Sequence, residues 1–299
     1  MGTDKHPPDA GLGYYQRPGV MTWAGEHAGR LDGLPADVGG LAEVTQGILI
    51  HEHLAGLYDF KLPDDRRDSV HLRPAELLLE RIISEDARPL SVARAASARV
   101  AGNCRHFTVL LVTLLRAQGT PARARCGFGG YFGPGTFEDH WVCEYWAAGQ
   151  QRWALADAQL DARQRDFFTI GFDVLDVPRD QFLVAGDAWA RYRAGTADPG
   201  NFGLTLLHES GAWWIASNLI RDVAALCGME MLPWDVWGAM PGPADVIGPD
   251  LTALLDELAA LTADPDASLA ELRARYAADE RLRVPAVVRN AIRGTTELV

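Results

Sequence analysis

The chain has 299 residues, of which 48% are hydrophobic, so it can bury a full core as one elaborated domain or two modest ones. Its formal net charge of -12 would repel phosphate backbones and anionic lipid. We therefore expect neither nucleic acid nor a membrane as its partner. No stretch approaches the ~18 apolar residues of a membrane span, and the segment Met1–Gly19 lacks the apolar part of a signal peptide. The sequence predicts a cytoplasmic protein.

The cysteines and histidines follow neither a disulfide pattern nor a metal-binding pattern. Without a signal peptide, the few cysteines argue against a disulfide framework, and no C-x-x-C pair indicates structural zinc. His51 and His53, in the segment HEH, would point to opposite sides of a helix, and the H-E-x-x-H spacing is absent. We therefore expect neither a metal nor another cofactor. Arginine far outnumbers lysine, as is typical of a GC-rich bacterial genome.

The chain begins with an irregular segment and continues into helices. Residues 1–40 are rich in Pro and Gly and show no clear period. From Leu41 to Leu57 apolar residues recur at helical spacing, which predicts a helix. A second helix follows Pro74, a residue suited to the first turn of a helix. The chain before residue 100 is therefore predicted to be mainly helical.

Residues 102–119, GNCRHFTVLLVTLLRAQG, have the pattern of a buried helix that begins at a cysteine. The apolar residues follow the stripe of a helix, and Gly119 supplies a stop signal. Asn103 is a natural N-cap, which places Cys104 in the first turn. Unpaired backbone N–H groups and the positive end of the helix dipole favour an anion there, so the thiolate should be stabilised. Alternatively, Cys104 is a small buried hydrophobic residue, as most cytosolic cysteines are.

The segment over residues 139–157 could supply the base and the carboxylate that a cysteine nucleophile needs. Its sequence, DHWVCEYWAAGQQRWALAD, alternates with a period of two around a turn, which predicts two antiparallel strands. If Trp146 pairs with Gln151, His140 falls directly opposite Asp157, where a carboxylate can orient an imidazole. A slip of one residue would put the carboxylate on the wrong face. The alternative is that these are exposed residues with no coupling between them.

Neighbouring polar residues are weaker candidates. His106 lies about 200° around the helix from the cysteine, so we expect it to point away and to make a buried polar contact. Asp161 is a reserve for the orienting carboxylate if the register differs. Glu138 and Asp139 could tune the neighbouring histidine or bind a cationic substrate, although acidic residues at strand ends are usually solvated.

Beyond about residue 185 the pattern becomes helical again, most clearly in PDLTALLDELAALTADPDASLAELRARYAADE. Asp266 and Ser268 are plausible caps of the last helix. The sequence thus predicts three parts: an irregular segment over residues 1–40, a core with a helical lead-in over 41–185, and a mainly helical extension over 186–299.

The order of the candidate residues resembles that of the transglutaminase-like superfamily. The matching pieces are GNCRHFTVLLVTLLRAQGTPARARCGF, DHWVCEYW and RWALADAQL. The resemblance implies an α+β fold with a papain/transglutaminase-like core, in which the nucleophile helix packs on an antiparallel sheet flanked by N- and C-terminal helical segments. It also implies Cys104 as nucleophile, His140 as general base and acid, and Asp157 as orienting carboxylate. The chain has His-Trp-Val and Asp-Ala-Gln where the family commonly has His-Ala-Trp and Asp-Pro-Thr.

This set of residues predicts acyl transfer. The leading hypothesis is an amide hydrolase or transamidase that acts through a thioester on a peptide or small-molecule amide. A biosynthetic acyltransferase that forms amides from a thioester donor, or a binding module that kept the fold without turnover, are the alternatives. The backbone N–H of Cys104 would be one donor to the developing oxyanion. Asn103 could be the second, although its role as a cap competes.

Overall fold

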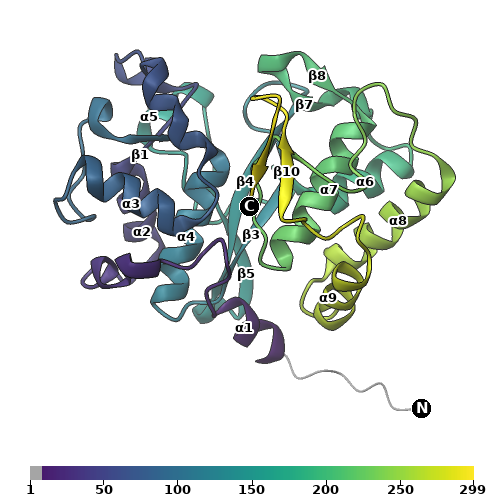
Figure 1. Ribbon diagram of the computed structural model, residues 1–299, viewed down its shortest axis with the longest axis horizontal. Coiled ribbons are helices and arrows are strands. Elements are labelled where there is room, and N and C mark those ends of the chain that lie inside the picture. The colour runs from purple at the N-terminus through teal and green to yellow at the C-terminus, as the bar shows by residue number, and fades with distance from the viewer. Residues whose placement is uncertain (1–8) are drawn as a thin grey trace. The chain divides into compact units, whose positions relative to one another are not determined.

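The computed structural model describes residues 9–299 and has the predicted α+β architecture (Figure 1). The described residues form two compact units that interleave along the sequence: unit 1 comprises residues 9–14, Arg125–His140 and Arg179–Val299, and unit 2 comprises Tyr15–Ala124 and Trp141–Pro178. The strands β3 (Ala122–Gly129) and β4 (Phe137–Ala147) each contain residues of both units. The division of the chain at residues 40 and 185 stays a prediction. Residues 1–8, the start of the predicted irregular segment, lie outside the described residues.

The helices of unit 2 gather around α4 (Cys104–Ala117). Both α2 (Val38–Ile48) and α3 (Ala75–Glu85) pack against it, and nearly every residue of α4 is buried. Pro74 is the N-cap of α3, in agreement with the predicted start. The unit also contains α5 (Ala162–Phe168) and the 3-10 turns η1 (Gly25–Leu31), η2 (Ala55–Tyr58), η3 (Asp64–His71), η4 (Ala96–Ala98) and η5 (Ala148–Gln150).

The helix predicted from Leu41 to Leu57 is wrong in its second half. Helix α2 ends at Ile48, and the chain continues as β1 (Leu49–His51), which pairs in parallel with β2 (Val100–Gly102). Leu49 and Ile50 are each 1% exposed. Extended backbone buries them as fully as a helix would, and β2 satisfies the backbone groups. Because β2 lies about 50 residues further along the chain, the spacing of apolar residues around Leu49 does not indicate that a strand forms there.

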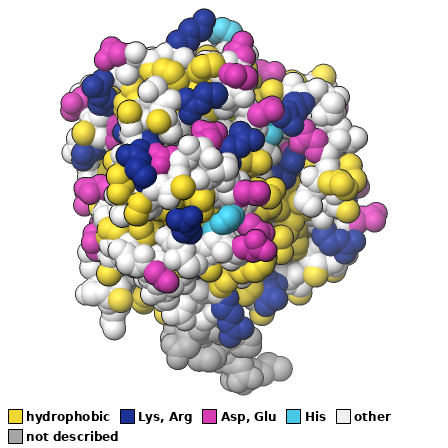
Figure 2. Space-filling model, turned by 60° about the vertical axis from the view of Figure 1, so that its left-hand side comes forward, with side chains coloured by type: hydrophobic (Ala, Val, Ile, Leu, Met, Phe, Trp, Pro, Cys, Tyr) yellow, Lys and Arg dark blue, Asp and Glu magenta, His cyan; other side chains and the backbone are white. Residues whose placement is uncertain are grey.

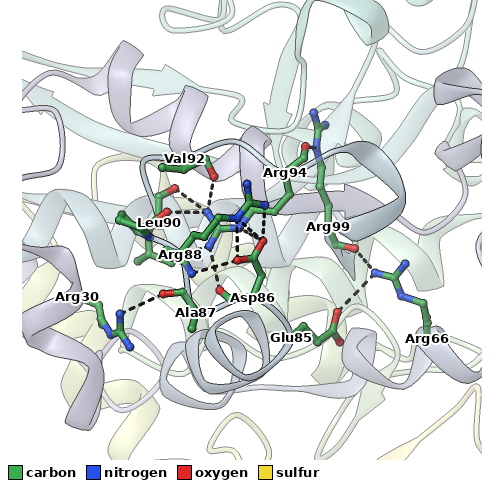
Figure 3. A network of polar contacts seen from close by, with 11 residues as sticks. Arg30, Arg66, Glu85, Asp86, Ala87, Arg88, Leu90, Val92, Arg94 and Arg99 are labelled. Atoms are coloured by element: carbon green, nitrogen blue, oxygen red, sulfur yellow. Dashed lines mark hydrogen bonds and ion pairs between the residues drawn. The ribbon is translucent and has the colours of Figure 1, made fainter.

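One buried arginine, Arg94, organises the loop between α3 and β2 (Figure 3). It is 3% exposed, and its guanidinium donates to the backbone carbonyls of Asp86, Arg88 and Pro89 at 3.1, 2.8 and 2.8 Å. Its backbone N–H donates to Gly47 of α2 at 2.8 Å. Because buried carbonyl groups need such donors, Arg94 holds the path of the chain that leads into β2 and α4.

Strands β4 and β5 (Arg152–Ala156) form the predicted antiparallel hairpin, but in a different register. Trp146 pairs with Trp153 instead of Gln151. The turn has the predicted four residues but lies one residue later in the chain: it contains η5 and Gln151, which takes a left-handed conformation with φ of 51°. The predicted direct pairing of His140 with Asp157 is therefore wrong. The register differs by two residues, so each side chain keeps its predicted face of the strand.

Unit 1 combines a mixed sheet with helices. Its strand order is β6-β3-β4-β7-β8, with β6 (Phe182–Val184) antiparallel to β3, β7 (Phe202–Leu204) parallel to β4, and β8 (Glu209–Ser210) antiparallel to β7. Helices α6 (Ala185–Arg193), α7 (Ala212–Leu226) and α8 (Pro249–Ala263) pack on one another, and α9 (Leu269–Ala278) packs on α7 and α8. The remaining elements are α1 (Asp9–Tyr15), η6 (Pro199–Asn201), η7 (Thr205–Leu207), β9 (Asp235–Val236), β10 (Val287–Asn290) and β11 (Thr295–Leu298).

The surface mixes charged and apolar side chains. On the face shown in Figure 2, basic and acidic side chains lie interspersed with hydrophobic ones. Within residues 9–299, no helix has both the length and the apolar character that a membrane crossing requires.

Candidate active site

Cys104 is the first residue of α4, as predicted. Asn103 is the N-cap in extended backbone, and its Oδ1 accepts a hydrogen bond from the backbone N–H of Arg105 at 3.1 Å. Cys104 is 7% exposed. The thiol therefore lies at the end of a helix where free backbone N–H groups and the helix dipole stabilise negative charge.

His106 belongs to the structure of this helix start, which confirms the prediction of a buried polar contact. Its Nδ1 lies 3.2 Å from the backbone N of Asn103 and 2.8 Å from Oδ1 of the same residue, and its Nε2 lies 3.1 Å from the carbonyl oxygen of Leu72. Burial holds the pKa of His106 well below its ordinary value of 6.5. The ring is therefore neutral near pH 7 and serves the capping box instead of the chemistry.

The segment from His51 to His53 lies beside the start of α4, which sequence reasoning missed. His51 aligns with Gly102 in the β1–β2 pair, and the N–H of Glu52 donates to the carbonyl of Gly102 at 2.9 Å. Glu52 is 8% exposed, and burial raises its pKa to about 7, although Arg67 lies 3.6 Å from the carboxylate. The sequence feature that could have indicated this position is the apolar run just before His-Glu-His, which forms β1. Among the described residues, no group of three or more His, Cys, Asp or Glu could hold a metal ion.

Glu52→Gln should remove a pH-dependent loss of stability. The carboxyl pKa of about 7 in the folded protein lies above its ordinary value of 4.5. Between these values the unfolded chain releases its proton while the folded protein keeps it, so the free energy of unfolding falls as pH rises. The effect is at most about 3.5 kcal/mol at ~1.4 kcal/mol per pKa unit. Urea unfolding should show the variant gaining stability over wild type from pH 4.5 to pH 8. If the difference in free energy of unfolding between variant and wild type did not change with pH, the raised pKa of Glu52 would be contradicted.

His140, in unit 1, lies among aromatic side chains. Its ring centroid lies 4.8 Å from that of Phe132, 5.9 Å from that of Tyr131 and 6.3 Å from that of Phe182. His140 itself is 2% exposed. Edge-to-face packing of this kind restricts the orientation of the imidazole. Sequence reasoning missed these three aromatic residues, although Tyr131 and Phe132 follow a Gly-Gly pair just before the strand that carries the histidine.

The two acidic residues before His140 make specific contacts instead of being merely solvated. Asp139 is 8% exposed, and its Oδ1 accepts a hydrogen bond from Nδ2 of Asn218 in α7 at 2.8 Å. Burial raises the pKa of Asp139. The carboxylate of Glu138 accepts the backbone N–H of Thr205 at 2.9 Å. Both carboxyl groups therefore anchor the start of β4.

Asp157 and its reserve, Asp161, occupy different environments in unit 2. Asp157 is 1% exposed; its N–H donates to the carbonyl of Val174 at 2.7 Å, and its Oδ1 accepts the N–H of Gln159 at 3.1 Å. Asp161 is the N-cap of α5, where Oδ1 accepts from the backbone N–H of Gln164 and Oδ2 accepts from Tyr58 at 2.7 Å. The structure thus assigns Asp161 a capping role.

The three predicted catalytic residues are divided between the units. Cys104 and Asp157 belong to unit 2, and His140 ends the segment Arg125–His140 of unit 1. Their action as a triad stays a prediction.

Buried polar atoms without a hydrogen-bond partner occur close in sequence to each of the three. Among residues 9–299 these atoms include Nδ2 of Asn103, Nε1 of Trp141 and Oε1 of Gln159. Such atoms are rare in native proteins because leaving them unpaired is costly. These three retain hydrogen-bonding capacity that a substrate could use. Others, such as Nε of Arg94 and Nε of Arg221, lie elsewhere.

Two comparisons with known proteins match part of this chain. Residues 78–158 match the family model of the transglutaminase-like superfamily. A solved structure from Cytophaga hutchinsonii, described as a candidate cysteine protease, is 17% identical with a TM-score of 0.35 over 59% of this chain. This chain spans 48% of that structure's length. The sequence has no significant match among curated proteins. The family match supports a cysteine-type enzyme in general.

Proposed function

We propose that this protein is a cysteine-dependent acyl-transfer enzyme, an amide hydrolase or transamidase that works through a thioester on a peptide or small-molecule amide. The observation that carries the proposal is the position of Cys104 as the first residue of α4, inside the segment that matches the family. A thiol at this position gains stabilisation of its thiolate from the helix terminus.

The proposed chemistry uses three side chains in two half-reactions. The Cys104 thiolate forms a bond to the carbonyl carbon, and the carbonyl π electrons move to oxygen. When the intermediate collapses, the leaving amine takes a proton from His140 and a thioester remains. Water or an amine then attacks the thioester, His140 takes its proton, and the thiolate is released. Asp157 orients the imidazole and stabilises its protonated form.

Alkylation by iodoacetamide at pH 7, followed by peptide mass mapping, tests whether Cys104 is an activated nucleophile. Burial raises the pKa of Cys143 and raises that of Cys227 to about 12, so both should react slowly and serve as internal controls. Cys104 should react at least about tenfold faster than either control. His140→Ala should change the rate at Cys104 and leave the controls unchanged. If Cys104 is labelled slowly and His140→Ala does not change its rate, the result would favour a binding module without catalytic activity.

A further inference from the structure

The N-cap of α4 contains a hydrogen-bond donor that capping does not use. Oδ1 of Asn103 accepts the backbone N–H of Arg105, whereas Nδ2 of the same amide has no partner among the described residues. Asn103 is 5% exposed, so the unpaired donor lies away from bulk water. An unsatisfied buried donor destabilises the folded protein. The role as a cap and the role as a donor therefore use different atoms of one side chain and do not compete.

The local structure fixes which way the amide points. Oδ1 accepts the Arg105 N–H and also lies 2.8 Å from Nδ1 of His106, so the amide nitrogen lies on the side away from both groups. The ring of His106 thus contacts both the backbone N and the side-chain oxygen of Asn103, at 3.2 and 2.8 Å from Nδ1. A Cβ at Gly102 would lie 2.9 Å from Cβ of His106, so this close approach requires glycine. The amide is therefore set in place before any substrate arrives, as a transition-state donor must be.

Capping alone does not explain an asparagine at this position. Serine and aspartate cap helices about as well as asparagine, and neither would bury an unpaired NH₂ group. The next residue, Cys104, is the first of the helix, so its backbone N–H has no intrahelical acceptor. Two free donors therefore stand on consecutive residues at the candidate nucleophile.

We propose that Nδ2 of Asn103 and the backbone N–H of Cys104 together form the oxyanion hole, an inference that rests on the proposed function. When Sγ bonds to the carbonyl carbon, the π electrons move to oxygen, which accepts hydrogen bonds from both donors. When the intermediate collapses, these electrons restore the C=O bond and the leaving group departs with a proton from His140. The donors neither gain nor lose a proton.

The test compares acyl transfer with alkylation in Asn103→Ser and in the isosteric Asn103→Asp. Both variants keep an oxygen cap and lack the amide donor. Hydrolysis of 4-nitrophenyl acetate passes through an oxyanion, whereas iodoacetamide alkylation of Cys104 displaces iodide without forming one. We expect kcat to fall about 100-fold in both variants with KM nearly unchanged. In Asn103→Ser the alkylation rate of Cys104 should stay at the wild-type value, and the thermal midpoint should not fall because the unpaired donor is gone. In Asn103→Asp the added carboxylate should also slow alkylation, since it disfavours the thiolate.

Each other outcome overturns the assignment. If Asn103→Ser keeps kcat within about threefold of wild type while Cys104→Ala loses turnover, the amide is not an oxyanion donor. If alkylation slows in step with hydrolysis in both variants, Asn103 acts only through the helix cap. If Cys104→Ala hydrolyses the ester as fast as wild type, the proposed function itself fails, and the oxyanion hole falls with it.

Discussion

Asp157→Asn is expected to lower kcat for 4-nitrophenyl acetate by about 10⁴-fold. An asparagine offers an N–H group where the carboxylate would accept one, so the imidazole of His140 would be held in the wrong tautomer and its protonated form would lose its counter-charge. Asp157 is 1% exposed, so bulk water supplies little compensation. Steady-state hydrolysis with separate kcat and KM measures the effect, and the thermal midpoint shows whether the variant is folded.

Asp161→Asn is the matched control, because it makes the same chemical change four positions along the chain. Asparagine can replace aspartate as an N-cap, so α5 should keep its start. We expect turnover within about threefold of wild type, since an N-cap acts on helix stability and not on the reacting atoms. A large loss in Asp161→Asn together with wild-type turnover in Asp157→Asn would exchange the roles of the two carboxylates.

Asp222→Ala is expected to lower the free energy of unfolding of the protein by about 3–5 kcal/mol. Asp222 of α7 is 0% exposed and accepts two hydrogen bonds from Arg125 of β3, at 3.1 and 2.9 Å. It also accepts the backbone N–H of Cys126 at 2.9 Å. The substitution leaves a buried guanidinium and a backbone donor without their acceptor, which is far more costly than the loss of an exposed pair. Urea unfolding measures the difference.

Two further variants separate burial from charge pairing. Arg125→Met combined with Asp222→Leu removes both charges, so it should recover most of the lost stability, less about 1–3 kcal/mol for the unpaired N–H of Cys126. Asp176→Ala breaks the pair with Arg152, whose side chains are 41% and 43% exposed, and should change stability by less than about 1 kcal/mol. Equal effects of Asp222→Ala and Asp176→Ala would refute this account.

The sequence by itself determined the elements whose causes are local. An N-cap residue, a regular apolar stripe and a glycine stop specify α4, so the first-turn position of Cys104 could be predicted. Alternation with a period of two likewise predicted β4 and β5, because each strand has a buried face. The resemblance to the transglutaminase-like superfamily depended on these same local segments, which lie within the family match over residues 78–158.

Only the tertiary structure decided the features that depend on distant partners. Leu49 and Ile50 became a strand because β2 pairs with them, and a turn placed one residue later in the chain moved the register of the β4–β5 hairpin by two residues. The raised pKa of Glu52 and the buried Asp222 depend on desolvation by neighbours from other segments. Strand pairing and desolvation are set by which parts of the chain meet, and local periodicity does not contain that information.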